Sequence, residues 1–336
     1  MNTLTRRAAT AGLLSLPAIR RARADEAIRM RCSIDTAPAH GRNVNIAAFL
    51  KTVETESRGR IKTELFESGQ LYADLNVLKA LMQGDIDMCA PGAWAITGFV
   101  PEGDIFQLPA MYDQPIEVIH RVADGQAGKL VAGVAESKLR CRVLGRWLDN
   151  GFSNWFTVKV PLHTFADLKG LKIRNSGGVG QSWRTKFFDA IPTVTPWPSV
   201  PLGLSQGMFD GLISANDSVQ SAKLFDTGLR YSLQDHNFFG AYLPMLSHAF
   251  WEKLPPDLQK LVVDLWEANI GAYRARMAAG QAKARATLEG LGMTFVDVPT
   301  EQAAAVRAEM LKQQDAVAKE MRIAPEVVAA VMKDIG

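Results

Sequence analysis

The stretch Asp167-Leu168-Lys169-Gly170-Leu171-Lys172-Ile173-Arg174, followed by Asn175-Ser176-Gly177-Gly178-Val179-Gly180, predicts a strand, a turn and a helix in succession. Residues 171–174 alternate apolar and basic side chains, which is the pattern of a half-buried strand. The paired glycines then supply a turn, and we expect the next helix to begin near Trp183. A strand, a tight turn and a helix form the repeating unit of an α/β fold.

Arg174 ends this strand, where it is well placed to hold a carboxylate. Its guanidinium offers a planar fork of donors, and the start of the following helix offers free backbone N–H groups. The sequence lacks Gly-x-Ser-x-Gly, His-Glu-x-x-His and P-loop motifs. We therefore expect a protein that binds an organic anion without transforming it, and not an enzyme.

Residues 1–24 have the features of a cleaved export signal. Arg6 and Arg7 precede a short apolar run at 8–16, and Ala22-Arg23-Ala24 forms an Ala-x-Ala site. The arginine pair leaves both the Sec and the twin-arginine routes open. Because the apolar run is too short to span a bilayer, we expect a soluble, periplasmic mature protein.

The charge balance changes when the signal is removed. The full chain has 38 Lys and Arg against 35 Asp and Glu. Five of the arginines and none of the acids lie in residues 1–24, which leaves 33 basic and 35 acidic residues and a net charge of −2. A nucleic-acid partner therefore has no support from composition.

The cysteines and histidines show no metal-site spacing. Cys32, Cys89 and Cys141 lie in apolar contexts without a Cys-x-x-Cys pair, so we expect buried free thiols, with one disulfide as the alternative. The histidines are scattered along the chain. We expect no metal and no cofactor.

Alternating strands and helices predict two α/β lobes, because about 310 mature residues exceed one ordinary core. The first unit reads βαβαβ and places ligand-binding loops after Asp35, Phe66 and Ala90. Its first helix, 42–57, carries Val44, Ala47, Ala48 and Leu50 on the expected buried face. The other expected elements of the first unit are strands 28–35, 61–66 and 86–90 and helix 75–82, followed by a strand at 143–148. The remaining expected elements are a crossing segment 152–158, the strand–turn–helix 171–190, helix 202–207, strand 211–215, a strand with Phe238, Phe239 and Tyr242, and helix 255–277.

Four segments in order resemble the solute-binding proteins of tripartite ATP-independent periplasmic (TRAP) transporters, the DctP-like family. They are 59–71 (GRIKTELFESGQL), 78–90 (LKALMQGDIDMCA), 167–174, and 204–211 (LSQGMFDG). The resemblance implies an α/β, two-lobed periplasmic-binding-protein clamshell with mixed sheets, crossing strands and long C-terminal helices. The expected division is 25–149 plus about 237–275 for lobe I, 150–236 plus about 276–300 for lobe II, and 301–336 for C-terminal helices packed on the lobes.

The resemblance also implies a ligand, a partner and two contact residues. Arg174 would grip the carboxylate of a small organic acid, Asn216 would contact the ligand, and a TRAP permease would accept it from a monomeric receptor. Many relatives have another arginine shortly after the Asn-Gly at 150–151, but here Phe152-Ser153-Asn154-Trp155 follows. This departure favours one carboxylate clamp over two.

Further candidates come from polar and aromatic residues near the expected rims. Asn154, Asn175 and Ser176 would bind hydroxyl groups, while Trp94, Trp197 and Trp155 are candidates either for pocket wall or for core. The last candidates have an ordinary capping or surface role as the alternative: Glu67, His40, Arg184 and Asp217. We expect a short hydroxylated monocarboxylate or sugar acid, with an aromatic or keto acid, or presentation to a membrane sensor, as alternatives.

Overall fold

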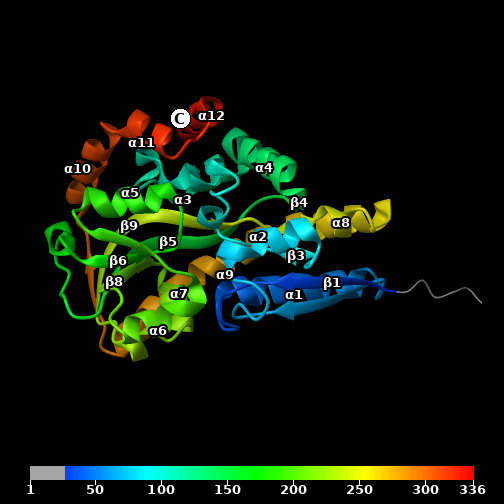
Figure 1. Ribbon diagram of the computed structural model, residues 1–336, viewed down its shortest axis with the longest axis horizontal. Helices are drawn as coiled ribbons and strands as arrows, with labels where there is room; N and C mark the ends of the chain where they lie inside the picture. The colour runs from blue at the N-terminus through cyan, green and yellow to red at the C-terminus, as the bar shows by residue number, and fades with distance from the viewer. Residues whose placement is uncertain (1–26) are drawn as a thin grey trace, which may run out of the picture.

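A computed structural model describes residues 27–336, so the export signal predicted for 1–24 lies outside the described residues. Its elements form two lobes, each built on one sheet (Figure 1). The first lobe contains β1 (Ile28–Ser33), β2 (Ile61–Phe66), β3 (Met88–Cys89), β4 (Cys141–Val143) and β10 (Met245–Ser247) in the order β2-β1-β3-β10-β4. β1 pairs in parallel with β2 and β3, whereas β10 is antiparallel to β3 and β4. The predicted βαβαβ unit therefore forms, and the sheet is mixed.

The second lobe carries the stretch from which the fold was predicted. Its sheet has the order β11-β9-β5-β8-β6-β7 and comprises β5 (Leu148–Thr157), β6 (Lys172–Asn175), β7 (Ile191–Val194), β8 (Gly211–Ser214), β9 (Tyr231–Tyr242) and β11 (Thr294–Asp297). α5 (Val179–Phe187) starts directly after the paired glycines, earlier than the expected start near Trp183. α6 (Val200–Ser205) and α7 (Asn216–Ser221) follow β7 and β8. β5 and β9 are the long antiparallel crossing strands.

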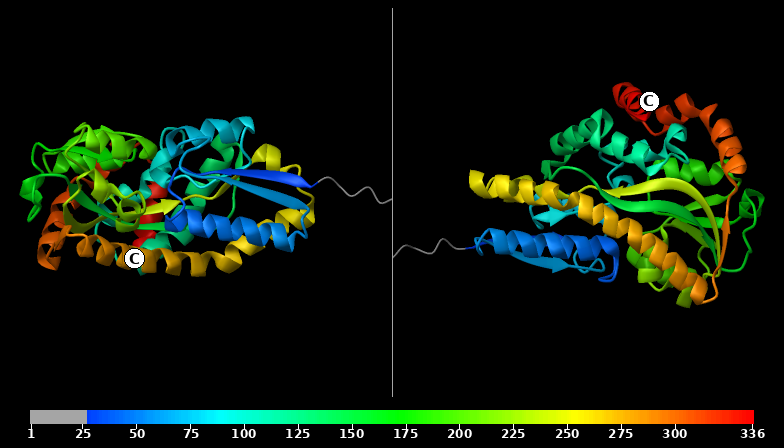
Figure 2. Two further views of the ribbon diagram at one scale, coloured as in Figure 1. Left: turned by 90° about the horizontal axis from the view of Figure 1, so that it is seen from below. Right: turned by 180° about the vertical axis from the view of Figure 1, so that it is seen from behind.

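One long helix connects the lobes. α9 (Pro256–Gly290) has 35 residues and packs on α1 (Gly41–Glu56) of the first lobe and on α7 of the second. Figure 2 shows it running along the back of both lobes. It extends well past the predicted end at 277. Within residues 27–336, no helix combines the length and apolar character of a membrane span.

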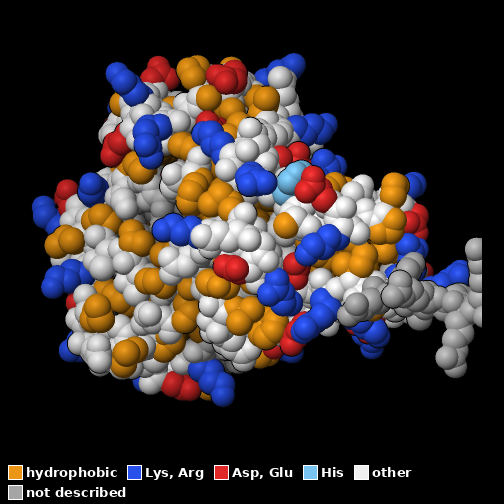
Figure 3. Space-filling model, turned by 45° about the vertical axis from the view of Figure 1, so that its right-hand side comes forward, with side chains coloured by type: hydrophobic (Ala, Val, Ile, Leu, Met, Phe, Trp, Pro, Cys, Tyr) orange, Lys and Arg blue, Asp and Glu red, His pale blue; other side chains and the backbone are white. Residues whose placement is uncertain are grey.

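The remaining helices are distributed around the two sheets (Figure 1). They are α2 (Asp74–Gln83), α3 (Ile116–Asp124), α4 (Gln126–Leu139), α8 (His248–Trp251), α10 (Thr300–Leu311), α11 (Gln314–Glu320), α12 (Pro325–Ile335) and short 3₁₀ helices η1 (Ala93–Ala95), η2 (Pro101–Gln107), η3 (Pro109–Met111), η4 (Phe165–Leu168), η5 (Trp197–Ser199) and η6 (Leu224–Thr227). α12 packs on α3 and α4, and α11 packs on α5. On the face drawn in Figure 3, basic and acidic side chains are interspersed.

Two local predictions were wrong. Residues 143–148 do not form one strand, because β4 ends at Val143 and β5 begins at Leu148. Helix α1 buries Leu50 as predicted, but the rest of its apolar face is Ile46, Phe49 and Val53, while Val44 is 42% exposed. Its buried face also holds polar side chains at its first turns, Arg42, Asn43 and Asn45. An apolar-periodicity argument misses such a face because those side chains find partners only in the folded protein.

Candidate functional site

A narrow cavity lies where the two lobes meet. The first lobe contributes Asp35, Thr36, Arg42, Asp74, Leu75 and Trp94, the second contributes Arg174, Ser176, Trp197, Ser214 and Ser218, and the crossing strands contribute Asn150, Ser153, Phe238 and Tyr242. The free volume is about 40 Å³, which is room for no more than about three water molecules. The lobes are therefore closed on each other, and an organic acid requires them to separate before it can bind.

Arg174 is the cationic group of this cavity that is available to bind a ligand. It is 1% exposed at the end of β6, and its guanidinium donates from Nε and Nη2 to the Thr195 carbonyl (2.9 and 2.7 Å) and from Nη1 to Ser176 Oγ (2.9 Å). Arginine has five N–H donors, so two remain for a ligand. Within residues 27–336, no carboxylate forms an ion pair with Arg174. Burial, partly offset by Asp35, lowers the pKa of Arg174 to about 9, which leaves it protonated at neutral pH.

A second arginine of the cavity is already neutralised. Arg42, fully buried on α1, forms ion pairs with Asp35 (Nη2 to Oδ1, 2.5 Å) and Asp74 (Nη1 to Oδ2, 2.8 Å). Burial opposes its charge, but Asp74, Tyr242 and Asp35 outweigh that effect and raise the pKa of Arg42. Because two carboxylates neutralise this guanidinium, it stiffens the wall and adds no free positive charge.

Aromatic rings enclose the cavity from both lobes. The Trp197 ring lies 5.3 Å from the guanidinium carbon of Arg174, and the Tyr242 ring lies 4.4 Å from that of Arg42. Trp94 packs at an angle against Tyr242 and Phe238. Such walls exclude water and strengthen the electrostatic interactions inside.

Direct hydrogen bonds join the lobes beside the cavity. The Gly41 N–H of α1 donates to Asp217 Oδ2 of α7 at 2.9 Å, and His40 Nε2 lies 2.9 Å from Ser218 Oγ. His40 Nδ1 accepts from the Arg42 N–H, so its Nε2 carries the proton and donates to Ser218. Burial and the charge of Arg42 lower the pKa of His40 to about 3, which keeps the ring neutral. His40 and Asp217 thus contact the partner lobe, one layer behind the cavity.

The start of α5 is not available to a ligand. Asp104 of η2 accepts the Gly180 N–H at 3.0 Å and is 1% exposed. The expectation that this helix terminus would help to hold a ligand carboxylate was therefore wrong, because the protein supplies its own carboxyl group there.

Four of the predicted site residues line the cavity, namely Arg174, Ser176, Trp94 and Trp197. Three others point into the protein. Asn175 bonds to Thr185 Oγ1, Trp155 donates to Asp235 Oδ2, and Arg184 donates to the Gln107 carbonyl behind Phe238. Glu67 accepts from Asn43 and does not line the cavity. We assign these four side chains to packing and hydrogen bonding in place of the ligand contacts predicted for them.

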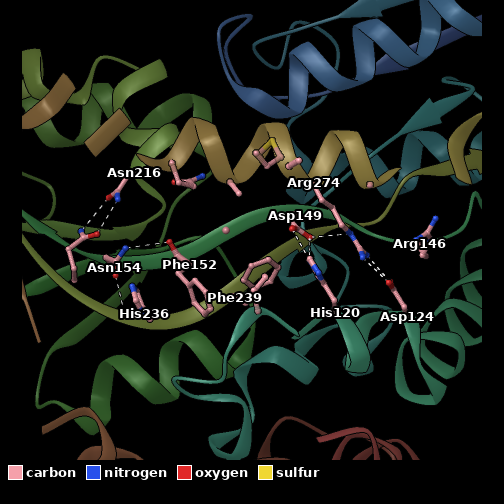
Figure 4. A pocket seen from close by; sticks show the side chains of 18 residues that line it. His120, Asp124, Arg146, Asp149, Phe152, Asn154, Asn216, His236, Phe239 and Arg274 are labelled. Atoms are coloured by element: carbon pink, nitrogen blue, oxygen red, sulfur yellow. Dashed lines mark hydrogen bonds and ion pairs between the residues drawn. The ribbon is translucent and has the colours of Figure 1, made fainter. Parts of the chain in front are cut away.

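Asn154 and Asn216 face a second, more open cavity of about 700 Å³ between α9 and the crossing strands (Figure 4). Asn154 Oδ1 accepts the His236 N–H, and Asn216 pairs with Gln234. The arginines of this cavity are already paired. Arg274 is bidentate to Asp124 at 2.7 Å, and Arg146 contacts Glu267 at 2.7 Å. An organic anion therefore finds its unpaired cation in the smaller cavity.

Sequence reasoning missed most of the cavity wall. Asp35 was expected only as the start of a rim loop, and Arg42, Asp74, Ser214 and Ser218 were not considered. Arg42 stands in the first turn of the helix that follows the expected rim loop after Asp35, and that position was a signal that could have been followed. Within residues 27–336, no group of three or more metal-ligating side chains occurs. Cys32, Cys89 and Cys141 are free and buried.

Comparison with known proteins supports these observations. A family model described as bacterial extracellular solute-binding protein, family 7, matches residues 36–320. The chain is 27% identical over 327 residues to the C4-dicarboxylate-binding periplasmic protein DctP of Rhodobacter capsulatus, which covers 95% of this chain and 92% of that protein. It is 25% identical over 272 residues to the 2,3-diketo-L-gulonate-binding periplasmic protein YiaO of Escherichia coli K12, which covers 81% of each.

The fold is also similar to that of solved structures. The sugar acid binding protein DctPAm of Advenella mimigardefordensis, in complex with galactonate, matches with a TM-score of 0.86 at 19% identity and covers 92% of this chain and 98% of that one. The clamshell fold and the TRAP solute-binding resemblance predicted from the motifs are thereby confirmed. The chain belongs to the bacterial extracellular solute-binding proteins of family 7, which are periplasmic transport receptors and not enzymes.

Proposed function

We propose that this protein is an extracytoplasmic receptor that closes on a hydroxylated monocarboxylate and delivers it to a TRAP-type permease. The observation that carries the proposal is the buried, unpaired Arg174 in a cavity whose other arginine, Arg42, is already neutralised. One available cation suits one carboxylate. Asn150, Ser153, Ser214 and Ser218 line the same cavity and supply hydrogen-bonding groups for hydroxyls.

The ligands after which similar proteins are named are all organic acids but differ in kind. One relative is named for C4-dicarboxylates, another for 2,3-diketo-L-gulonate, and the sugar acid binding protein holds galactonate. A keto or aromatic acid is the second candidate, because Trp94 and Trp197 form flat walls that also suit a planar ligand.

A thermal-shift screen of the mature protein tests the proposal. The panel contains aldonates, uronates, branched hydroxy acids, aromatic acids and dicarboxylates, after refolding to remove carried-over ligand. An acid at 100 times its Kd stabilises the protein by about 2.7 kcal/mol and raises Tm by a few degrees. Arg174→Ala should abolish the shift, whereas Lys172→Ala, an exposed neighbour on β6, should retain it. Arg174→Ala binding within threefold of the parent would show that the clamp is elsewhere.

Delivery to a permease and a monomeric state are tested separately. Uptake of the identified acid into proteoliposomes that hold the permease should require this receptor, and light scattering should give the mass of one chain. Uptake without the receptor would favour presentation to a membrane sensor.

A further inference from the structure

The first-lobe wall of the cavity holds two acids against one base. Arg42 bonds to both Asp35 and Asp74, so two ionised carboxylates leave this wall with one net negative charge. Tyr242 stacks on Arg42 but carries no formal charge. Arg174 lies on the opposite wall, contributed by the second lobe, and Asp35 is close enough to offset part of the effect of burial on its pKa. The cavity is therefore positive at one end and negative at the other.

Hydrogen bonds hold both acids in place and leave one oxygen unused. Asp35 Oδ1 contacts Arg42, and its Oδ2 accepts the Asp74 N–H at 2.9 Å. The carboxylate of Asp74 receives Arg42 Nη1 (2.8 Å) and the Gly92 N–H (3.0 Å), both on Oδ2. In the described part of the chain, Asp74 Oδ1 has no protein donor, and the side chain is 12% exposed beside the cavity. That oxygen can accept a hydrogen bond from a ligand hydroxyl.

We propose that Asp74, supported by Asp35, is the specificity-determining residue that accepts a hydroxyl group and rejects a second carboxylate at the far end of the ligand. This inference rests on the proposed function, because it needs one carboxylate on Arg174. A distal hydroxyl donates to Asp74, whereas a distal carboxylate faces a like charge in a water-poor cavity. Such repulsion discriminates between ligands of equal length without any change in shape.

The protonation state of Asp74 should make dicarboxylate binding depend on pH. Burial raises the pKa of Asp74 to about 7, Arg42 opposes that shift, and the charge of Asp35 reinforces it. Protonated Asp74 carries no charge and can donate a hydrogen bond to a carboxylate. Arg42, Tyr242 and Arg174 keep their charge states near neutral pH, because the pKa values of Arg42 and Tyr242 are raised and that of Arg174 is lowered only to about 9. Dicarboxylate binding should therefore strengthen as the pH falls through 7.

Two four-carbon probes test the inference by calorimetry on the full mature protein. At about pH 8, D-erythronate should bind at least about tenfold more tightly than succinate. Asp74→Asn keeps the shape and the acceptor oxygen, so it should improve succinate binding about tenfold and change erythronate binding only about threefold. Asp85→Asn removes one exposed charge just after the same helix, and it should change neither affinity.

A titration of the parent protein keeps the test independent of the variant. Between about pH 8.5 and about pH 6.5, succinate affinity should rise while erythronate affinity stays level. Equal affinities for the two probes, both lost in Arg174→Ala, would overturn this inference and leave the proposed receptor intact, as would a flat succinate titration. No binding of any organic acid would overturn both.

Discussion

The Asp104 carboxylate accepts the Gly180 N–H at 3.0 Å and so occupies the start of α5, the helix to which the strand of Arg174 leads. Asp104 comes from η2, far away in the sequence, and is 1% exposed. The helix terminus that could have held a ligand anion is thus filled by the protein itself. The ligand carboxylate is left to Arg174, whose free donors lie in the neighbouring cavity.

Asp104→Asn should flatten the dependence of stability on pH. Burial raises the pKa of Asp104 to about 7, against the backbone N–H groups of Gly180 and Val179, which lower it. The folded protein then binds this proton more tightly than the unfolded chain does. The resulting stability is complete below the unfolded pKa near 3.8 and is lost as the pH rises to about 7.

Urea unfolding of the unliganded protein at several pH values checks this prediction. The amide of Asp104→Asn keeps an acceptor for Gly180 without a charge to bury. From about pH 4.5 to pH 7.5, the free energy of unfolding of the variant should rise by on the order of 2 kcal/mol relative to that of the parent. For Asp85→Asn, with the same charge change on the surface, the free energy of unfolding should change with pH as it does in the parent. The same pH dependence in Asp104→Asn would show that the pKa of Asp104 is not raised by folding.

Gly178→Ala should destabilise the protein markedly. Gly178 has φ +80° and ψ 153°, a conformation that L-residues rarely adopt, and a Cβ there would lie 2.5 Å from Asp104 Oδ1. We expect a loss of about 2 kcal/mol or more. At Gly98 a Cβ meets no atom within 4 Å, so Gly98→Ala should stay within about 0.5 kcal/mol. Thermal unfolding of both variants separates the two outcomes, and equal Tm values would show that the turn tolerates a side chain.

Asp217→Ala should weaken closure of the lobes. Asp217 Oδ2 accepts the Gly41 N–H across the two lobes and lies outside the ligand cavity. Loss of one such bond costs about 0.5–1.5 kcal/mol, so affinity for the acid found in the screen should fall about threefold to tenfold. Small-angle scattering should report a larger radius of gyration without ligand. Asp226→Ala, exposed on the same lobe, should match the parent in both measurements.

The three cysteines should be unreactive in the folded protein. Cys32, Cys89 and Cys141 are buried, and burial raises the pKa of Cys32 and of Cys141 to about 12. The thiolate is the reactive form, so an aromatic disulfide reagent at about pH 8 should label none of them. In denaturant all three should react, which matches the cysteine content of the chain. Labelling of fewer than three thiols in denaturant would reveal a disulfide.

Much of the fold could be predicted because its signals are local. Strand β6, the glycine turn and helix α5 arise from neighbouring residues in 167–187, and β1 with β2 follows from simple alternation. Arg174 could be placed at the end of its strand for the same reason. The length of α9 could not be predicted, because its second half is held by packing on α7 and on β5.

Within the site, Asn154 of β5 shows the limit of what the sequence alone can predict. Asn154 bonds to the His236 N–H beside the large cavity, while its neighbour Ser153 lines the small one. Adjacent strand residues point to opposite faces, so a single position decides which cavity a side chain meets. The pairing of β5 with β9 shifts register between Asp149 and Gly151 and again between Ser153 and Trp155. The first of these irregularities brings Asn150 and Ser153 to the same cavity in spite of their odd spacing.

The sequence alone determined the α/β class, the strand that carries Arg174 and the lack of a catalytic motif, since each depends on residues close together in the chain. Tertiary structure alone decided that Arg42 meets Asp35 and Asp74, that Asp104 covers the start of α5, and that Asn216 turns away to Gln234. The physical reason is that a buried charge or amide is stable only beside its partner. Most of these partners come from distant segments, which only the folded chain brings together.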